Sequence, residues 1–242
     1  MKPIAIITGA TGGIGNAVAR RLSSDGFSVV IHYSGNHEKA KAAVKEIERS
    51  GGKAVAIAAD VSNPYEVKQL FEKAARELGS VAVVVHTAGI MPLSPIKQGD
   101  IDTFDRIIAT NLRGTFLVMS EAANQLSKGG RVIVFSSSVI ARSFPTYGPY
   151  IASKAGVEGL VKVLANELGD RGITVNAIAP GPVGTPLFLK SRSKKQIAEM
   201  VKMTPLGRIG EAADISGVVA FLAGKDSSWV NGQVLRVNGG FA

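Results

Sequence analysis

Short apolar runs of strand length alternate with longer segments of helical pattern along the whole chain. The strand-like runs are Ile4–Thr8, Ser28–His32, Ala54–Ala58, Val81–His86, Arg131–Phe135, Thr174–Ala179 and Val234–Val237. The helical patterns are Glu38–Ser50, Pro64–Leu78, Ile101–Asn124 (which a break near Leu112 could divide), Tyr150–Leu168 and Ala212–Ala223. This alternation is typical of a parallel sheet with helices on both faces. With right-handed crossovers, we predict an α/β protein with a doubly wound parallel sheet of about seven strands.

The length and composition suit a single domain spanning residues 1–242. The chain has no cysteine, which excludes disulfides, thiolate catalysis and cysteine-based zinc sites. Its three histidines, His32, His37 and His86, lack metal-site spacing supported by carboxylates, so no metal is predicted. His86 ends an apolar run and is expected to be a core residue with satisfied hydrogen bonds rather than a metal ligand.

The chain carries a formal net charge of +9, with positive residues spread over amphipathic segments. One cluster, Lys190, Arg192, Lys194 and Lys195, is predicted to be a solvated helix face, because no nucleic-acid motif accompanies it. An anionic cofactor or an acyl carrier would explain surplus positive charge equally well. No apolar segment approaches ~18 residues and no signal-peptide pattern is present, so we expect a cytoplasmic protein without a membrane span or a nucleic-acid partner.

A glycine-rich turn, Thr8–Gly15, joins the first apolar run to the helical pattern Ala17–Leu22. Such a turn lets a diphosphate approach the backbone and meet the free N–H groups at the start of the helix. Its spacing differs from the usual GxGxxG, and no Lys-Ser/Thr follows the last glycine as in a P-loop. An ordinary tight turn is the alternative interpretation.

Tyr150 is the only tyrosine with a lysine four residues later, and it lies thirteen residues after Ser137. A phenol is a poor acid at neutral pH, with an ordinary pKa near ~10. On a helix, Lys154 would share a face with Tyr150, and a nearby ammonium would lower the pKa of the phenol. The pair therefore predicts a tyrosine that exchanges a proton near pH 7, although this spacing alone also arises by chance.

These motifs follow one another in an order that resembles a known family. The glycine turn, Asn111, Ser137, the Tyr150–Lys154 pair and Pro180-Gly181 look like the motif series of the short-chain dehydrogenase/reductases. The resemblance extends from Met1 to the final Asn238-Gly239-Gly240 and implies a Rossmann-like fold. Within the family, the chain looks most like the 3-oxoacyl-[acyl-carrier-protein] reductase type and related bacterial NADPH carbonyl reductases.

The resemblance implies four catalytic residues. Tyr150 would protonate the substrate carbonyl oxygen while the nicotinamide delivers hydride to carbon, and Ser137 would hydrogen-bond that oxygen. Lys154 would lower the pKa of Tyr150 and bind the nicotinamide ribose. Asn111 would complete a water-linked proton route behind Lys154. A helix cap is the structural alternative for Ser137 or Asn111.

The second strand-like run favours NADP(H). It ends in His32-Tyr33-Ser34-Gly35-Asn36, without the acid that usually holds the ribose 2′-hydroxyl of NAD. Ser34, Asn36 and nearby N–H groups could accept a 2′-phosphate, but no arginine occupies the usual positions, so use of NAD(H) stays open. The predicted cofactor-binding residues are Gly9, Thr11, Gly13, Ile14, Gly15, Tyr33, Ser34, Asn36, Asp60, Val61, Ala88, Gly89, Tyr150, Lys154, Pro180, Gly181, Val183 and Thr185.

The chain departs from the family after the fourth strand-like run. Many relatives have Asn-Asn-Ala-Gly there, whereas this chain has His86-Thr87-Ala88-Gly89. The side-chain hydrogen bonds of the first asparagine must be replaced or lost. This puts sheet rigidity or cofactor affinity in question more than the reaction.

Residues 185–205 resemble the loop and helix that close over substrate. Mainly apolar side chains would line the pocket: Met91, Leu93, Phe144, Tyr147, Leu187 and Phe188. Such a pocket suits a ketone with a hydrophobic arm. Lys128 and Arg171 occupy positions that resemble those holding an acyl carrier protein, but basic residues are common there throughout the family.

Three functions are consistent with these residues. The first is NADPH-dependent reduction of a ketone to a secondary alcohol, with 3-oxoacyl thioesters among the candidate substrates. The second is a carbonyl or sugar dehydrogenase of other or broad specificity. The third is a non-catalytic, NADP-sensing regulator, whose mark would be loss of Tyr150 or Lys154, and both are present.

The resemblance also implies a homotetramer, a dimer of dimers. The helix that bears Tyr150 and the segment Asn111–Leu126 would pack against the same elements of another subunit. Small residues on that helix, Ala155, Gly156 and Gly159, would allow close contact.

Overall fold

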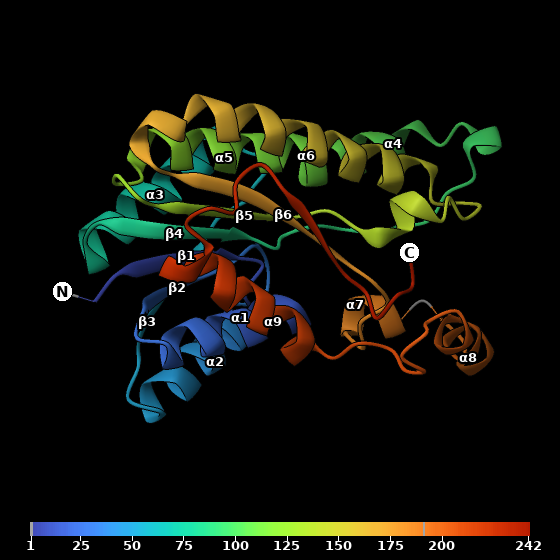
Figure 1. The fold of residues 1–242 in the computed structure, drawn as a ribbon, viewed down its shortest axis with the longest axis horizontal. Helices are drawn as coiled ribbons and strands as arrows, with labels where there is room; N and C mark the ends of the chain where they lie inside the picture. The colour runs from blue at the N-terminus through green and yellow to red at the C-terminus, as the bar shows by residue number, and fades with distance from the viewer. Residues whose placement is uncertain (1, 191) are drawn as a thin grey trace.

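Seven parallel strands form one sheet in the computed structural model, which describes residues 2–190 and 192–242 (Figure 1). They are β1 (Ile4–Thr8), β2 (Ser28–Tyr33), β3 (Lys53–Ala58), β4 (Val81–His86), β5 (Arg131–Phe135), β6 (Thr174–Pro180) and β7 (Val234–Val237). The strands lie in the order β3-β2-β1-β4-β5-β6-β7. The predicted α/β class and doubly wound sheet are confirmed, and each strand lies within one residue of its predicted bounds.

Helices cover both faces of the sheet (Figure 1). One layer contains α1 (Gly13–Ser24), α2 (His37–Arg49) and α9 (Ala212–Ala223), and the other contains α3 (Pro64–Leu78), α5 (Gly114–Gln125) and α6 (Gly148–Glu167). The shorter helices are α4 (Ile101–Ile107), α7 (Pro186–Leu189) and α8 (Lys194–Lys202). The last two lie beyond the carboxyl ends of the strands.

Strand β1 shows why the strands read as continuous apolar runs. Its side chains alternate, with Ile4 and Ile6 packed in the core on the α3, α5 and α6 side, and Ala5 and Ile7 in the core beside α1 and α9. All four residues are buried, because a parallel sheet covered on both faces exposes neither side of its central strands.

The predicted helix Ile101–Asn124 is divided in the structure. A π-helical segment, Ile108–Arg113, separates α4 from α5 and contains the expected break at Leu112. Such segments are rare and occur frequently at functional sites. This one carries Asn111, whose side chain is fully buried.

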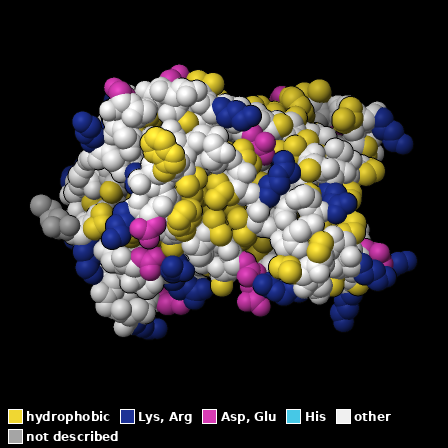
Figure 2. Space-filling model, in the orientation of Figure 1, with side chains coloured by type: hydrophobic (Ala, Val, Ile, Leu, Met, Phe, Trp, Pro, Cys, Tyr) yellow, Lys and Arg dark blue, Asp and Glu magenta, His cyan; other side chains and the backbone are white. Residues whose placement is uncertain are grey.

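Some of the exposed apolar side chains lie on the two helix layers. Figure 2 shows apolar side chains gathered in the middle of one face, over α9 and β7. Phe221 of α9 is 43% exposed. In the opposite helix layer, Phe116 of α5 and Val163 of α6 are 54% and 56% exposed.

The strand order reverses at β1, which lies between β2 and β4. In open parallel sheets, ligands bind outside the carboxyl ends of the strands at such a switch point. The glycine turn follows β1, and Ser137 follows β5. The fold therefore brings the predicted motifs to one edge of the sheet.

Candidate active site

Two adjoining cavities lie at the carboxyl edge of the sheet. The larger, about 570 Å³, is lined by the glycine turn and by residues that follow β2, β3 and β4. The smaller, about 150 Å³, contains Ser137, Tyr150 and Lys154. The two share wall residues, among them Gly89, Phe135 and Thr185, so one long ligand can extend from the larger cavity into the smaller.

The glycine turn brings its own backbone very close together. Gly9 has a φ of +65°, in the left-handed region that favours glycine. A Cβ on Gly15 would lie 2.4 Å from the carbonyl oxygen of Gly9 and 2.6 Å from Thr87 Oγ1. The N-cap residue of α1 is Gly12, which has no side chain to cap the helix. The first-turn N–H groups of α1 can therefore meet an anion in the larger cavity.

Side chains from β2 and β4 fasten this turn. The N–H of Gly9 donates to His32 Nδ1 at 3.1 Å, and His32 Nε2 lies 2.9 Å from the carbonyl oxygen of Ala59. Thr8 Oγ1 lies 2.8 Å from His86 Nδ1, and Thr87 Oγ1 donates to the carbonyl oxygen of Thr8 at 2.6 Å. His86-Thr87 thus supplies side-chain hydrogen bonds between β4 and β1 where relatives have Asn-Asn.

Both fastening histidines are neutral at physiological pH. Burial lowers the pKa of His32 to about 4 and that of His86 to about 3. A neutral His32 keeps a lone pair on Nδ1, which is what accepts the Gly9 N–H. His86 is buried, as expected, but the expectation that its hydrogen bonds are satisfied is wrong for Nε2, which has no hydrogen-bond partner among the described residues.

Most of the predicted cofactor-binding residues line the larger cavity: Gly9, Thr11, Gly13, Ile14, Gly15, Tyr33, Ser34, Asp60, Val61, Ala88, Gly89 and Thr185. Others line the smaller cavity: Tyr150, Lys154, Pro180, Gly181 and Val183. Six residues that were predicted for neither the cofactor nor the substrate also line the larger cavity: Gly12, His32, Thr87, Ile90, Thr110 and Phe135. Gly12 belongs to the glycine turn and Thr87 precedes Ala88-Gly89, and the others stand in no motif that marks them in the sequence.

Asn36 and Asp60 also make local hydrogen bonds within the chain. The Asn36 side-chain oxygen accepts from Lys39 N at 2.9 Å and caps α2, and Asn36 is not among the residues lining the larger cavity. Asp60 accepts from the N–H and hydroxyl of Ser62 at 2.9 and 2.8 Å, as a turn aspartate does. Strand β2 itself contributes Tyr33, followed by Ser34, to this lining and no carboxylate, which fits a ribose 2′-phosphate.

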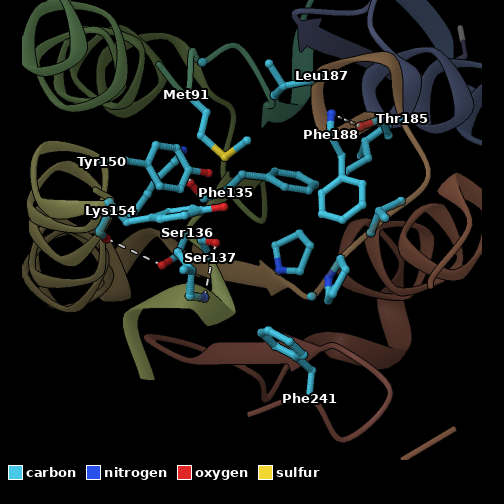
Figure 3. A pocket seen from close by; sticks show the side chains of 18 of the residues that line it. Met91, Phe135, Ser136, Ser137, Tyr150, Lys154, Thr185, Leu187, Phe188 and Phe241 are labelled. Atoms are coloured by element: carbon cyan, nitrogen blue, oxygen red, sulfur yellow. Dashed lines mark hydrogen bonds between the residues drawn. The ribbon is translucent and has the colours of Figure 1, made fainter. Parts of the chain in front are cut away.

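Ser137, Tyr150 and Lys154 converge on the smaller cavity (Figure 3). Tyr150 and Lys154 project together from α6. Lys154 Nζ lies 5.8 Å from the ring centroid of Tyr150 and donates to the carbonyl oxygen of Phe135 at 2.7 Å. Ser137 follows β5 and also accepts from Val139 N at 3.4 Å, so its predicted capping alternative and its place in the cavity are both observed.

The neighbours of Ser137 are turned to other partners. Ser136 donates to Glu158 at 2.7 Å, and Ser138 donates to the carbonyl oxygen of Ala179 at 2.8 Å. Ser137 is therefore the hydroxyl of this run that remains beside Tyr150. A hydrogen bond between Ser137 and the phenol acts to lower the pKa of Tyr150.

The prediction that Tyr150 exchanges a proton near pH 7 is wrong for this structure, because burial outweighs the effect of any nearby positive charge on its pKa. Burial dominates and raises the pKa of Tyr150 to about 12. Burial also lowers the pKa of Lys154 to about 8, and its ammonium is directed to the Phe135 carbonyl. Tyr150 is consequently a neutral phenol at pH 7, in the protonation state that a proton donor requires.

Asn111 holds the backbone of Ile90, a residue that lines both cavities. Its side-chain oxygen accepts from Ile90 N at 2.8 Å, and its amide donates to the carbonyl oxygen of Ile90 at 2.9 Å and to Ser153 Oγ at 3.2 Å. Thr115 donates to the Asn111 carbonyl at 2.6 Å. These contacts give Asn111 a positioning role for the Gly89–Ile90 backbone, and its place in a proton route stays a prediction.

Five of the six predicted substrate-pocket residues line the smaller cavity: Met91, Phe144, Tyr147, Leu187 and Phe188. The prediction for Leu93 is wrong: it is 40% exposed and is not among the lining residues, because it lies in the extended segment that leads away from β4. Phe241, Met200 and Arg192 line the cavity and were missed. Phe241 packs 6.1 Å from Phe144, ring to ring, although 97 positions separate them in the chain.

The basic residues singled out in the sequence lie in two regions of the structure. Arg192 lines the smaller cavity, so the interpretation of its cluster as a wholly solvated face is wrong for this residue. Arg171 donates to the carbonyl oxygens of Ala123 and Leu126 at the end of α5. Lys128 and Arg171 precede β5 and β6 and thus lie at the amino edge of the sheet, away from the cavities of the same chain.

Two further findings concern residues 2–190 and 192–242. Within these ranges, no helix combines the length and apolar character that a bilayer crossing demands. The same ranges contain no group of three or more His, Asp or Glu side chains arranged to hold a metal ion.

Comparisons with known proteins show which family the chain resembles. A family model described as enoyl-(acyl carrier protein) reductase matches residues 9–242. A short-chain type dehydrogenase/reductase of Picea abies is 40% identical and covers 98% of this chain and 91% of its own. NADPH-dependent aldehyde reductase 2, chloroplastic, of Arabidopsis thaliana is 41% identical, with 98% and 93% covered.

A bacterial relative and a solved structure are also similar over nearly the whole chain. The 3-oxoacyl-[acyl-carrier-protein] reductase FabG of Staphylococcus epidermidis is 38% identical, with 99% of each chain covered. Among solved structures, a blue fluorescent protein from a metagenomic library in complex with NADPH superimposes with a TM-score of 0.94. It is 37% identical, with 99% of this chain and 98% of that chain covered.

Proposed function

The chain belongs to the short-chain dehydrogenase/reductase family, and we propose that it reduces a small ketone or aldehyde to the alcohol. It is an oxidoreductase acting on carbonyl and alcohol groups, and its cofactor is NADP(H), as predicted from the sequence. A compartment that keeps this cofactor reduced, such as the cytoplasm, is its proposed location.

One observation carries the proposal. Tyr150 and Ser137 line a mainly apolar cavity that shares walls with the glycine-lined cavity. A carbonyl group in the smaller cavity would therefore meet a hydroxyl donor on one side and the nicotinamide end of the cofactor on the other. The cofactor, when bound, supplies the hydride.

Side chains of the protein supply the proton that the carbonyl oxygen gains during reduction. Ser137 donates a hydrogen bond to the carbonyl oxygen and stabilises its growing negative charge. Tyr150 transfers its phenolic proton to that oxygen, so carbon gains hydride, oxygen gains a proton and the product is the alcohol. The Lys154 ammonium stabilises the phenolate that remains. Asn111 keeps the Gly89–Ile90 backbone in place between the two cavities.

Initial rates test this proposal directly. NADPH oxidation at 340 nm is measured for simple ketones, aldehydes and 3-oxoacyl thioesters, with NADPH and NADH side by side. Reduction of several simple carbonyl compounds supports the proposal. Tight NADPH binding without turnover of any compound would instead favour the non-catalytic regulator, although Tyr150 and Lys154 are both in the cavity.

Reduction of a 3-oxoacyl thioester on an acyl carrier protein is the second candidate. The FabG relative and the enoyl-(acyl carrier protein) reductase model support it. The engaged side chain of Arg171 does not, because both of its terminal nitrogens already hold carbonyls of α5. Acetoacetyl thioesters reduced far better than simple ketones would favour this candidate, and the reverse order would favour a carbonyl or sugar dehydrogenase of other specificity.

Carbonyl reduction is expected to decline as the pH rises through about 8. Burial lowers the pKa of Lys154 to about 8, so its ammonium is present below that pH and is lost above it. Without the positive charge, the phenolate left after proton transfer is less stable. A profile of kcat/KM for reduction from pH 6 to 10 checks this, and a profile flat across that range would contradict it.

Ser34→Asp is expected to change the cofactor preference. A carboxylate at the end of β2 repels a 2′-phosphate and can accept from a ribose 2′-hydroxyl. The KM for NADPH should rise by ~10-fold or more, while that for NADH stays level or falls. Ser34→Ala is the matched control, because it removes the hydroxyl without adding charge. If Ser34→Asp raised the KM for NADPH and for NADH equally, Ser34 would not face the 2′ position of the ribose.

We also propose a homotetramer. Phe116 and Val163 expose apolar surface on α5 and α6, and a Cβ on Gly159 would meet no atom within 4 Å, so this face is open to another helix. The apolar surface over α9 and β7 could form a second interface (Figure 2). Light scattering at micromolar protein should give four times the mass of the chain. Phe116→Glu should reduce that mass, and a monomeric wild type would refute the assembly.

A further inference from the structure

Four aromatic side chains form a continuous series of neighbouring rings in the lining of the smaller cavity. The ring centroids of Tyr150 and Tyr147 lie 6.4 Å apart, those of Tyr147 and Phe144 6.0 Å, and those of Phe144 and Phe241 6.1 Å. Figure 3 shows both ends of this series, Tyr150 on α6 and Phe241 on the chain after β7. Each pair is tilted or edge-on, as aromatic rings prefer to be. We call these four residues the aromatic wall.

Phe241 has a fixed place in the aromatic wall. It is 3% exposed, and Arg142 Nε donates to its carbonyl oxygen at 2.6 Å while the guanidinium carbon lies 5.0 Å from its ring centroid. The Asn238 amide donates to Ser138 Oγ at 2.9 Å and so fastens the start of this segment beside Ser137. The chain after β7 is therefore attached to the same segment that presents the hydroxyl for the carbonyl oxygen.

The backbone around Phe144 adopts an unusual conformation. Ser143 has a φ of +49° and Thr146 a φ of +73°, in the left-handed region that is unfavourable for a β-branched residue. Ser94 N donates to the carbonyl oxygen of Thr146 at 3.0 Å and helps to hold this shape. Backbone strain of this kind occurs preferentially at functional sites, where the surrounding structure maintains it. Here it accompanies the placement of Phe144 and Tyr147 in the cavity lining.

We infer that the aromatic wall binds an aromatic ring of the substrate, so that the preferred substrates are ketones or aldehydes that carry a phenyl-type ring. This rests on the proposed carbonyl reduction and names its substrate class. The carbonyl group would lie at Tyr150 and Ser137, and the substrate ring would lie against Phe144 and Phe241. An aromatic ring gains tilted or stacked contacts there in addition to burial, whereas a saturated ring gains burial alone. The thioether of Met91, which also lines the cavity, favours an aromatic ring too.

The experiment compares phenyl ketones with their saturated counterparts. The kcat/KM with NADPH is measured for 4-phenyl-2-butanone and 5-phenyl-2-pentanone, and for the two cyclohexyl analogues. Saturated carbons separate ring from carbonyl in every compound, so the carbonyl groups are equally reactive. The cyclohexyl ring has more apolar surface, so burial alone favours the cyclohexyl ketones. Wild type should nevertheless prefer the phenyl ketone by ~3–10-fold for at least one spacer length.

Phe241→Leu removes the ring and keeps an apolar side chain, so it should lower the phenyl-to-cyclohexyl ratio by ~3-fold or more. Phe144→Leu should do the same, and it keeps the test intact if Phe241→Leu fails to fold. Phe104→Leu is the matched control, because Phe104 of α4 is 40% exposed and is not among the residues lining either cavity. It should leave the ratio as in wild type. The fluorescence of bound NADPH confirms that each variant binds cofactor.

Three results separate the possible failures. A wild-type preference that both leucine variants retain would overturn the role of Phe144 and Phe241. Reduction of both ketone series without any preference for phenyl would overturn the aromatic subsite and leave carbonyl reduction intact. Absence of NADPH turnover with either series, and with the simple ketones and aldehydes, would remove the proposed function itself.

Discussion

Tyr150→Phe is expected to lower kcat for carbonyl reduction by roughly 10²–10⁴-fold, because it removes the phenolic proton donor. Affinity for NADPH should change by no more than a few-fold, since the glycine turn and the ends of β2 and β3 remain as they are. Steady-state rates and NADPH fluorescence titration measure the two quantities separately. The ring of phenylalanine fills the same space, so the free energy of unfolding should change little.

Tyr65→Phe is the matched control for this prediction. It removes the same hydroxyl group from a residue of α3 that is 69% exposed. Its kcat should equal that of wild type. If Tyr150→Phe retained most of its activity, the proton would have to come from another group, and the role proposed for the Ser137, Tyr150 and Lys154 cluster would be wrong.

Gly15→Ala is expected to weaken NADPH binding by ~10-fold or more and to destabilise the fold by roughly 1–3 kcal/mol. The added methyl group would lie 2.4 Å from the carbonyl oxygen of Gly9 and 2.6 Å from Thr87 Oγ1. The first of these is a backbone atom in the turn itself, so relief requires the turn to move. NADPH titration and thermal unfolding check the two effects.

Gly169→Ala makes the same chemical change at a site where a Cβ would meet no atom within 4 Å. Both its NADPH affinity and its unfolding temperature should stay close to those of wild type. A Gly15→Ala protein with unaltered NADPH affinity would show that the turn does not approach the cofactor closely.

The strands, and the position of the site at the carboxyl edge of the sheet, could be predicted because the sequence patterns that indicate them lie within short segments. Strand β1 reads as a continuous apolar run, since both of its faces are buried, and the glycine turn follows it directly. Tyr150 and Lys154 share a helix face, so their spacing alone places them together. The division near Leu112 was visible in the pattern, but the π-helical form of Ile108–Arg113 was not.

Other features depend on contacts between distant segments and could not be predicted. Phe241 joins the cavity only because the chain after β7 returns to the region of Phe144. Arg192 belongs to a run of basic residues whose sequence resembles a solvated face, yet Tyr147 and Phe188 hold it in the wall. The pKa of Tyr150 follows burial more than its nearest lysine, and burial is a property of the assembled fold.

Beyond the walls that they share, the two cavities are built by different parts of the chain. The turn that meets the nucleotide is held by side chains from β2 and β4, whereas much of the smaller cavity comes from α7, α8, the loop after β5 and the chain after β7. Selection can therefore diversify substrate range by altering a few peripheral stretches while the coenzyme module stays constant. Exchanging residues 186–203 with those of a homologue is, by the same logic, a rational starting point for engineering new reductases.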